Sequence, residues 1–177
     1  FTLVRGFAAS LLLATVSAMA TGAQAQQTST NQVAAKTDWS VFEDKDPREC
    51  WAVSTPKETV NTKDGRVVAV KRGEILFMTF FRPGAGVSGQ VAFTGGYPFA
   101  NGSTVNLNIG GTQFELFTEG EWAWPSSAAD DTKIIAELKR GANAVLSARS
   151  GRGTQTKDSF SLSGYTAAVD EASKRCK

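Results

Sequence analysis

Acidic side chains near a pair of tryptophans are the residues of this chain whose types and spacing could do chemistry. The acidic residues are Glu119, Glu121, Asp130, Asp131 and Asp158, and the tryptophans are Trp122 and Trp124. Two carboxylates at the right separation hydrolyse a glycosidic bond, and an indole beside them can stack on the sugar ring. A periplasmic hydrolase is therefore kept as an alternative. Because Trp122 and Trp124 are two positions apart, a strand would place both on one face, where we expect them to pack in the core or at its rim.

The chain of 177 residues contains two cysteines and no histidine. Without histidine it cannot build a Ser-His-Asp triad, a Cys–His dyad or a His-ligated metal site. Two cysteines are also too few for a Cys₄ zinc site. These absences favour a protein without catalytic residues, metal ion or cofactor, with the carboxylate-based hydrolase above as the alternative.

Residues 84–89 have the spacing Gly-x-Gly-x-x-Gly after an apolar run, which is the pattern of a dinucleotide-binding loop. In that loop the third glycine opens a helix, whereas residues 90–94 here have the pattern of a strand. We therefore predict a flexible loop between two strands and no bound nucleotide. The net charge of +2 gives no strong field to attract nucleic acid or an anionic membrane, so neither is an expected partner.

The amino-terminal residues have the features of a secretory signal peptide. Arg5 precedes an apolar run, and Ala23 and Ala25 form an Ala-x-Ala cleavage site. The run of about 15 residues would reach roughly 22 Å as a helix, less than the ~30 Å hydrocarbon core of a bilayer. We predict cleavage after Ala25 and an exported protein. The alternative is that residues 1–25 remain as a membrane anchor.

The use of cysteine agrees with export. Cys50 and Cys176 allow one pairing, and an oxidising compartment permits it. The bridge would join the first strands to the carboxyl terminus, and closing so long a loop stabilises a fold by about 4 to 5 kcal/mol in the chain-entropy model. The alternative is two free thiols, which would be a reactive liability in an exported protein.

The rest of the chain predicts a mainly β protein. Residues 26–37 are polar and without a period, so we expect a flexible leader, followed by a single domain over residues 38–177. Short apolar runs broken by turn residues predict strands at residues 39–42, 50–54, 67–71, 75–82, 90–94, 104–109, 113–118, 144–149 and 156–162. Two helices are expected, one capped by Asp130 or Asp131 and one over residues 165–174. The predicted fold is an antiparallel β-sandwich with two short helices, one of them C-terminal.

Residues 150–156 predict a turn between two strands, with a glycine on each side of Arg152. Such a turn can hold the guanidinium outward, toward a carboxylate or phosphate of a partner. The alternative, which we prefer, is that Arg152 pairs with Asp158 across the hairpin and fixes its register. The candidate partner-binding residues are Arg149, Arg152, Thr154, Trp122 and Trp124.

Several short motifs occur together in the second half of the chain. They are Gly96-Tyr97-Pro98-Phe99, Ala123-Trp124, Arg152-Gly153-Thr154, residues 158–168 and the terminal Cys176. Together they resemble the invasion-associated locus B family of α-proteobacteria, and the resemblance extends from Trp39 to Cys176. It implies an exported protein, periplasmic or associated with the outer surface, which is linked to host-cell invasion and has no established enzymatic activity.

The expected function is therefore that of a non-enzymatic envelope protein. We expect it to act through protein–protein contacts at the cell envelope or the host surface, with a partner that the sequence does not identify. A further alternative is an accessory subunit of a membrane complex of the envelope.

Overall fold

The pattern of apolar residues explains the strands of the computed structural model, which describes residues 31–177. In β8 (Thr104–Ile109) every second side chain is apolar and buried. Gly110 and Gly111 follow with positive φ, which glycine adopts without strain, and the chain returns as β9 (Thr112–Glu119). The alternation predicted from the sequence is therefore present in this hairpin.

The strands of residues 31–177 form one 12-stranded antiparallel sheet, in the order β1-β2-β3-β6-β7-β10-β9-β8-β11-β12-β4-β5. The strands besides β8 and β9 are β1 (Gln32–Lys36), β2 (Trp39–Lys45), β3 (Arg48–Ser54), β4 (Glu58–Lys63), β5 (Arg66–Val67), β6 (Leu76–Arg82), β7 (Val87–Thr94), β10 (Trp122–Trp124), β11 (Asn143–Arg149) and β12 (Gln155–Ser161). A short 3₁₀ turn, Pro83–Ala85, lies between β6 and β7. Of the predicted loop over residues 84–89, residues 84–86 do connect two paired strands, whereas residues 87–89 already belong to β7.

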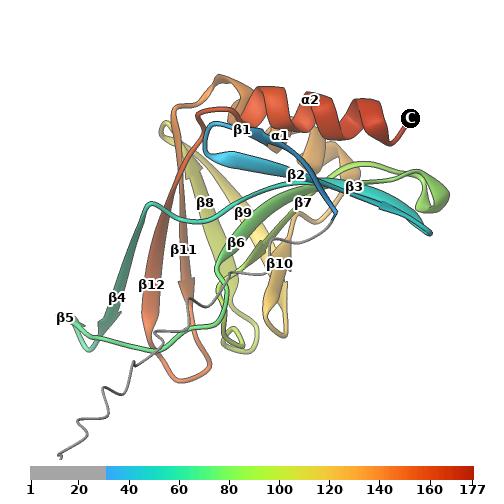
Figure 1. Ribbon diagram of the computed structural model, residues 1–177. Helices are drawn as coiled ribbons and strands as arrows, with labels where there is room; N and C mark the ends of the chain where they lie inside the picture. Colours follow the sequence, from blue (N-terminus) through green and yellow to red (C-terminus); the bar gives the residue numbers. More distant parts are fainter. Residues whose placement is uncertain (1–30) are drawn as a thin grey trace, which may run out of the picture.

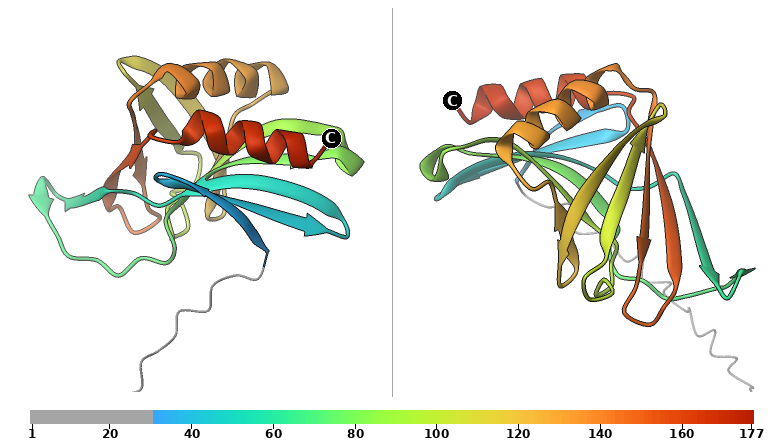
Figure 2. Two further views of the ribbon diagram at one scale, coloured as in Figure 1. Left: turned by 45° about the horizontal axis from the view of Figure 1, so that its top comes forward. Right: turned by 180° about the vertical axis from the view of Figure 1, so that it is seen from behind.

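The sheet bends back on itself, as Figures 1 and 2 show. Two helices, α1 (Ala128–Arg140) and α2 (Tyr165–Arg175), lie over the same side of the bent sheet. Side chains from the two halves of the bent sheet pack against each other in its interior. The ring centroids of Phe77 in β6 and Phe160 in β12 are 5.5 Å apart, and those of Phe93 in β7 and Phe160 are 6.2 Å apart. The predicted fold class, mainly antiparallel β with two helices, one of them C-terminal, is confirmed. The two layers of the sandwich are halves of one continuous sheet.

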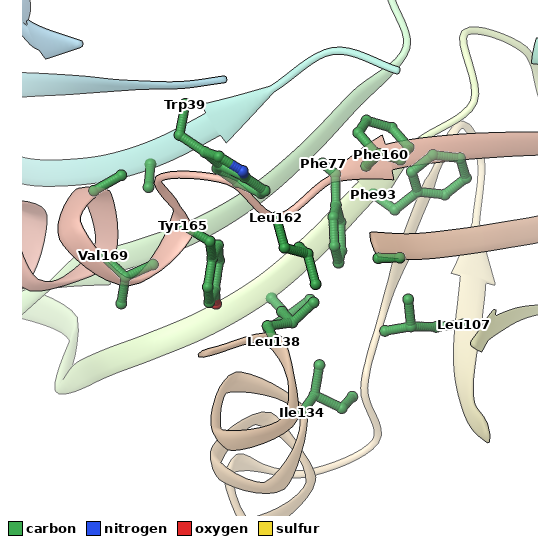
Figure 3. Packing of buried hydrophobic residues seen from close by; sticks show 14 of the residues in the cluster. Trp39, Phe77, Phe93, Leu107, Ile134, Leu138, Phe160, Leu162, Tyr165 and Val169 are labelled. Carbon is green, nitrogen blue, oxygen red and sulfur yellow. The ribbon is translucent and has the colours of Figure 1, made fainter. Parts of the chain in front are cut away.

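Trp39 lies at the centre of the core next to α2. Its indole packs edge-on against Tyr165, with the ring centroids 4.8 Å apart, and its N–H donates to the Ser161 carbonyl at 3.0 Å. The Tyr165 hydroxyl is hydrogen-bonded to Thr79 at 2.9 Å, and burial raises the pKa of Tyr165. Leu138 of α1 belongs to the same cluster (Figure 3). These buried rings link β2, near the start of the domain, to α2 at its end.

The first helix starts earlier than predicted because Ser127 caps it. Ser127 Oγ accepts a hydrogen bond from the Asp130 backbone N–H at 3.2 Å, and the helix begins at Ala128. Asp131, one of the two predicted caps, is buried instead and accepts a hydrogen bond from the Val91 backbone N–H at 2.8 Å. Burial raises the pKa of Asp131. This contact ties α1 to β7.

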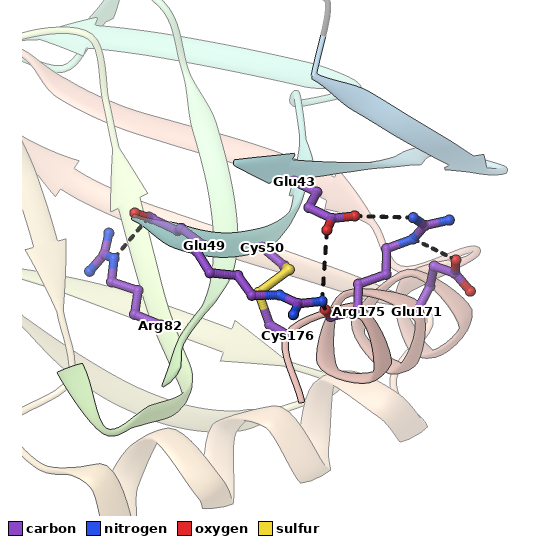
Figure 4. Close-up of a disulfide and its surroundings, with 8 residues drawn as sticks. Glu43, Glu49, Cys50, Arg82, Glu171, Arg175 and Cys176 are labelled. Atoms are coloured by element: carbon purple, nitrogen blue, oxygen red, sulfur yellow. Dashed lines mark hydrogen bonds and ion pairs between the residues drawn. A yellow bond between two sulfur atoms is a disulfide. The ribbon is translucent and has the colours of Figure 1, made fainter. Parts of the chain in front are cut away.

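A disulfide fixes the end of α2 to β3. Cys50 is fully buried in β3, Cys176 follows the last turn of α2, and their Cα atoms are 5.9 Å apart (Figure 4). Next to the bridge, Arg175 forms ion pairs with Glu171 at 2.7 Å and with Glu43 of β2 at 3.1 Å. The pairing expected from the sequence is present, and charged contacts support it on the solvent side.

Two segments differ from the prediction. β1 lies within residues 26–37, the predicted flexible leader, and pairs with β2, so the prediction is wrong for residues 32–36. The strand predicted at residues 67–71 is wrong beyond its first residue, because β5 ends at Val67, which is 77% exposed. After β5 the chain leaves the sheet as an irregular segment that ends at β6.

The predicted signal peptide and its cleavage site lie outside the described residues, as do residues 26–30 of the predicted leader. Within residues 31–177, no helix has the length and apolar character needed to cross a membrane.

We expect the double variant Cys50→Ala/Cys176→Ala to fold but to unfold at a lower urea concentration. Removing the bridge releases the constraint on the unfolded chain and reduces the free energy of unfolding by about 2 to 5 kcal/mol. Urea titration followed by tryptophan fluorescence measures this change, with reduced wild-type protein as the control. Equal unfolding midpoints for the variant and the oxidised wild type would contradict a stabilising bridge.

Candidate functional site

Arg72 and Asp158 form a buried ion pair at the base of a pocket. Nη1 and Nη2 of Arg72 donate to Oδ1 and Oδ2 of Asp158 at 2.8 and 2.6 Å. The two side chains are 6% and 0% exposed. This two-point contact engages both carboxylate oxygens away from water and fixes the plane of the guanidinium.

Arg72 is also held from other sides. Its Nε donates to the Gly95 carbonyl at 2.8 Å, and its Nη1 donates to Asn61 Oδ1 at 3.2 Å. Its guanidinium carbon lies 5.0 Å from the ring centroid of Tyr97. The Tyr97 hydroxyl is in turn hydrogen-bonded to Thr156 of β12. One arginine thus connects β4, the turn after β7, and β12.

The two segments that carry Arg72 and Tyr97 touch through glycines. The Gly73 backbone N–H donates to the Gly96 carbonyl at 2.8 Å. A Cβ on Gly96 would lie 2.6 Å from the Gly73 carbonyl oxygen, and Gly96 has a φ of +71°. Only glycine fits at position 96, and this close approach is what brings Tyr97 beside Arg72.

Burial shifts the ionisation of two groups at the base of the pocket. It raises the pKa of the Asp158 carboxyl, and the hydrogen bonds and charge of Arg72 oppose that rise. Burial also raises the pKa of the Tyr97 phenol, which the hydrogen bond with Thr156 opposes. Tyr97 therefore stays protonated at neutral pH. The base of the pocket is a network whose polar groups satisfy one another.

The pocket above this network has a volume of about 550 Å³. Its lining includes three exposed charged residues, Lys71, Glu121 and Arg152. In residues 31–177, no cluster of three or more His, Cys, Asp or Glu side chains is placed to hold a metal ion. The pocket therefore has hydrogen-bonded polar groups at its base and exposed charged side chains in its lining.

Hydrogen bonds with the backbone shape the loop that carries Arg152. The Ser150 N–H donates to the Thr154 carbonyl at 2.8 Å, and the Thr154 N–H donates to Ser150 Oγ at 3.1 Å. The Gly151 N–H donates to the Pro98 carbonyl at 2.9 Å, which ties the loop to the opposite wall of the pocket. Arg152 itself is exposed and makes no hydrogen bond or ion pair with any residue in the described range.

The predicted pairing of Arg152 with Asp158 is wrong, because Asp158 faces the interior of the sheet. Thr156, Asp158 and Phe160 lie at every second position of β12, so they share one face of the strand, and all three are buried. Arg152 lies in the loop before β12, on the solvent side. The same alternation is the signal that could have indicated a buried carboxylate, and a buried carboxylate needs a hydrogen-bond donor or a cation as its partner, which here is Arg72.

The other candidate residues lie at different places on the sheet. Arg149 is exposed at the end of β11 and lines a second depression, of about 480 Å³. Thr154 is buried, and its backbone closes the loop around Arg152. Trp122 and Trp124 flank the buried Ala123 and line a third hollow, of about 400 Å³, on the outer face. The candidates therefore do not form one site, and Ala123, not the tryptophans, takes the core position of β10.

Most of the carboxylates considered for glycoside hydrolysis are hydrogen-bonded to other residues of the fold. Asp158 and Asp131 are buried and engaged as described above. Asp130 accepts a hydrogen bond from the Ser127 hydroxyl at 2.8 Å, and this bond lowers the pKa of Asp130. Of the remaining two, Glu121 lines the pocket. The hydrolase prediction gains no support from these positions.

Comparison with known proteins decides the family. The sequence model of invasion associated locus B proteins matches residues 39–173. The chain belongs to this family. The crystal structure of invasion associated protein B from Bartonella henselae shares the fold of this locus B protein, with a TM-score of 0.53 and 15% identity over 78% of this chain and 94% of that one. Among curated proteins, none matches.

Two of the motifs that resemble the locus B family line the pocket. Gly96 and Tyr97 form one wall, and Arg152 and Thr154 belong to the loop on the other side. Asp158 lies beneath them and holds Arg72. Ala123-Trp124 and Cys176 lie elsewhere, at the outer hollow and in the disulfide, so the pocket accounts for part of the resemblance.

We expect Arg72→Met to reduce the free energy of unfolding by about 3 to 5 kcal/mol, because it leaves the carboxylate of Asp158 buried without a partner. The double variant Arg72→Met/Asp158→Leu should recover much of that loss, since it removes both charges. Urea unfolding of the four members of the cycle gives the coupling between the two positions.

Arg152→Ala is the matched control for this cycle, because it removes an exposed arginine at the opening of the same pocket. Its free energy of unfolding should stay within about 0.5 kcal/mol of the wild type. A loss for Arg72→Met no larger than that for Arg152→Ala would contradict the structural role of the buried pair.

Proposed function

We propose that this locus B protein is an exported, non-enzymatic binding protein that contacts a partner protein of the cell envelope or host surface through the pocket beside Arg152. One observation carries the proposal. Arg152 is exposed and has no partner within residues 31–177, at the opening of a pocket whose base is fixed by Arg72 and Asp158. Free charged groups around a rigid base are suited to recognition.

The charge around the opening favours an acidic group of the partner. The charge of Arg72 is matched by Asp158, so the exposed groups decide the field, and Lys71 and Arg152 outnumber Glu121. A guanidinium binds a carboxylate through two parallel hydrogen bonds, which gives direction as well as attraction. The proposed contact is therefore an aspartate, a glutamate or a terminal carboxylate of the partner protein.

The non-enzymatic part of the proposal rests on the state of the polar groups. The Tyr97 hydroxyl is hydrogen-bonded to Thr156, and both oxygens of Asp158 are bound by Arg72. A nucleophile or general base must be able to reach a substrate, and these groups are occupied by one another. Family membership points the same way, because no activity or catalytic residue comes with the resemblance.

The disulfide supports the exported part of the proposal. Structural disulfides persist in oxidising compartments and are rare in the reducing cytosol. The bridge between Cys50 and Cys176 is buried and joins two distant parts of the chain. A periplasmic or surface location is compatible with this chemistry.

We expect Arg152→Ala to weaken capture of the partner from envelope extracts at least fivefold, with the melting temperature unchanged, because an exposed guanidinium contributes little to folding. Arg152→Lys should weaken capture less if charge alone matters and as much as alanine if the planar fork is needed. Quantitative mass spectrometry measures the amount of each captured protein, and thermal unfolding measures the melting temperature of each variant.

Arg149→Ala is the matched control, because Arg149 is an exposed arginine three positions away that lines a different depression. The proposal counts as supported only by proteins whose capture depends on Arg152 and not on Arg149. If both variants capture the same proteins as the wild type, the pocket is not the binding site.

A further inference from the structure

An aromatic surface covers part of the outer face of the sheet, opposite the core. It consists of the rings of Phe42, Trp51, Phe80, Phe117, Trp122 and Trp124. Phe42 stacks on Trp51 with the centroids 5.4 Å apart, whereas Phe117 is 52% and Trp122 is 38% exposed. Aromatic side chains that gather on a solvent face, instead of being scattered, mark a contact site.

The aromatic surface contains the hollow of about 400 Å³ mentioned above. On β7 the residue in the middle of it is Ala92, which pairs with Met78 of β6 on one side. On the other side the register of β10 brings Trp124 next to Ala92, since Ala123 pairs with Phe93. The side chain of Ala92 is only a methyl group, and its larger neighbours rise above it, which creates the hollow. Ala92 therefore forms the floor, and the rings of Phe80 and the two tryptophans form the walls.

Polar groups are fixed at one edge of this hollow. The Arg82 guanidinium carbon lies 4.4 Å from the ring centroid of Phe80, its Nε donates to Glu49 at 2.8 Å, and its Nη1 donates to Gln90 Oε1 at 3.2 Å (Figure 4 shows the contact with Glu49). Nη2 of Arg82 and the side-chain N–H groups of Gln90 have no acceptor within residues 31–177. The edge thus offers free hydrogen-bond donors next to aromatic walls, with the Glu49 carboxylate as an acceptor.

We propose that this hollow binds a β-linked oligosaccharide of N-acetylhexosamines. The C–H faces of pyranose rings pack on indole and phenyl rings, and the acetamido and hydroxyl groups need both donors and acceptors at the edge, which Arg82, Gln90 and Glu49 provide. From β6 across β7 to β10 is about 10 Å at the usual strand spacing. Phe117 of β9 continues the aromatic surface beyond the hollow, so there is room for a chain of sugars and not only for one ring.

The charges at the edge argue against other ligands. Glu49 neutralises Arg82, so a phosphate group or a nucleic acid gains little attraction here. A purely apolar partner would leave the donors of Arg82 and Gln90 without acceptors, which costs free energy. The site shares no lining residue with the pocket beside Arg152, so the inference stands apart from the proposed protein contact.

The test measures binding of tetra-N-acetylchitotetraose to the full exported chain by isothermal titration calorimetry and by the change in tryptophan fluorescence. We expect measurable affinity, and a loss of about tenfold in Trp122→Ala and in Trp124→Ala, because each removes one stacking face. Ala92→Leu should also abolish binding, since it fills the floor while every ring and every polar group remains. Cellotetraose, which has the same linkage without acetamido groups, should bind more weakly.

Phe42→Ala is the matched control, because Phe42 belongs to the aromatic surface, does not line the hollow and stacks on Trp51, which does not line it either. It should bind the tetrasaccharide as the wild type does, and so should Arg152→Ala. No binding by the wild type, or binding that Ala92→Leu leaves intact, would overturn the proposal, as would equal affinity for cellotetraose. A dimer in sedimentation analysis that dissociates in Trp122→Ala would overturn it in favour of a second copy of this chain as the occupant.

Discussion

The buried contact between Arg72 and Asp158 is the interaction on which the pocket depends. Moving both charges out of water costs about as much free energy as their attraction returns, so the pair is better understood as a positional device than as a source of stability. Residues 68–75, between β5 and β6, form no strand. Their backbone is bonded to the rest of the chain by the Val68 N–H, which donates to the Asn61 carbonyl, and by the Gly73 N–H, which donates to the Gly96 carbonyl. Arg72 attaches this segment to β12, β4 and the turn at Gly95 at once. Together with the close approach of Gly73 and Gly96, this attachment holds Arg72 beside Tyr97 at the base of the pocket.

A second constraint keeps the bent sheet closed. Trp39 of β2 donates to a carbonyl at the end of β12, and the disulfide fixes α2 to β3. Both contacts join residues more than a hundred positions apart, so the ends of the domain hold each other in place. α2 packs on β2 and β3, and α1 packs on β7. The helices therefore cover the open side of the sheet, while the pocket keeps its own fixed base at Arg72.

The elements that were predicted correctly from the sequence are those with a local pattern of residues. Most of the features that were missed depend on contacts between residues far apart in the sequence. The hairpin of β8 and β9 and the helix from Tyr165 depend on alternation, turn glycines and a helical period, which are visible in a short stretch. β4 was missed because it is a polar strand near the sheet edge, with little apolar alternation. The partner of Asp158 was missed because Arg72 is 86 positions away in sequence. An apolar run over residues 67–70 wrongly predicted a strand, since nothing there lies over a core.

The strand β10 shows how one short element serves two faces of the sheet. The Gly120 carbonyl before it accepts a hydrogen bond from the Phe99 N–H, which fixes the turn beside the pocket. Glu121, just before β10, lines the pocket, whereas Trp122 and Trp124 line the outer hollow and Ala123 between them is buried in the core. Because the two sites use different side chains, occupation of one leaves the residues of the other free. The proposed protein contact in the pocket and the proposed saccharide in the hollow would then not compete for a side chain, although the two sites lie next to each other along the chain.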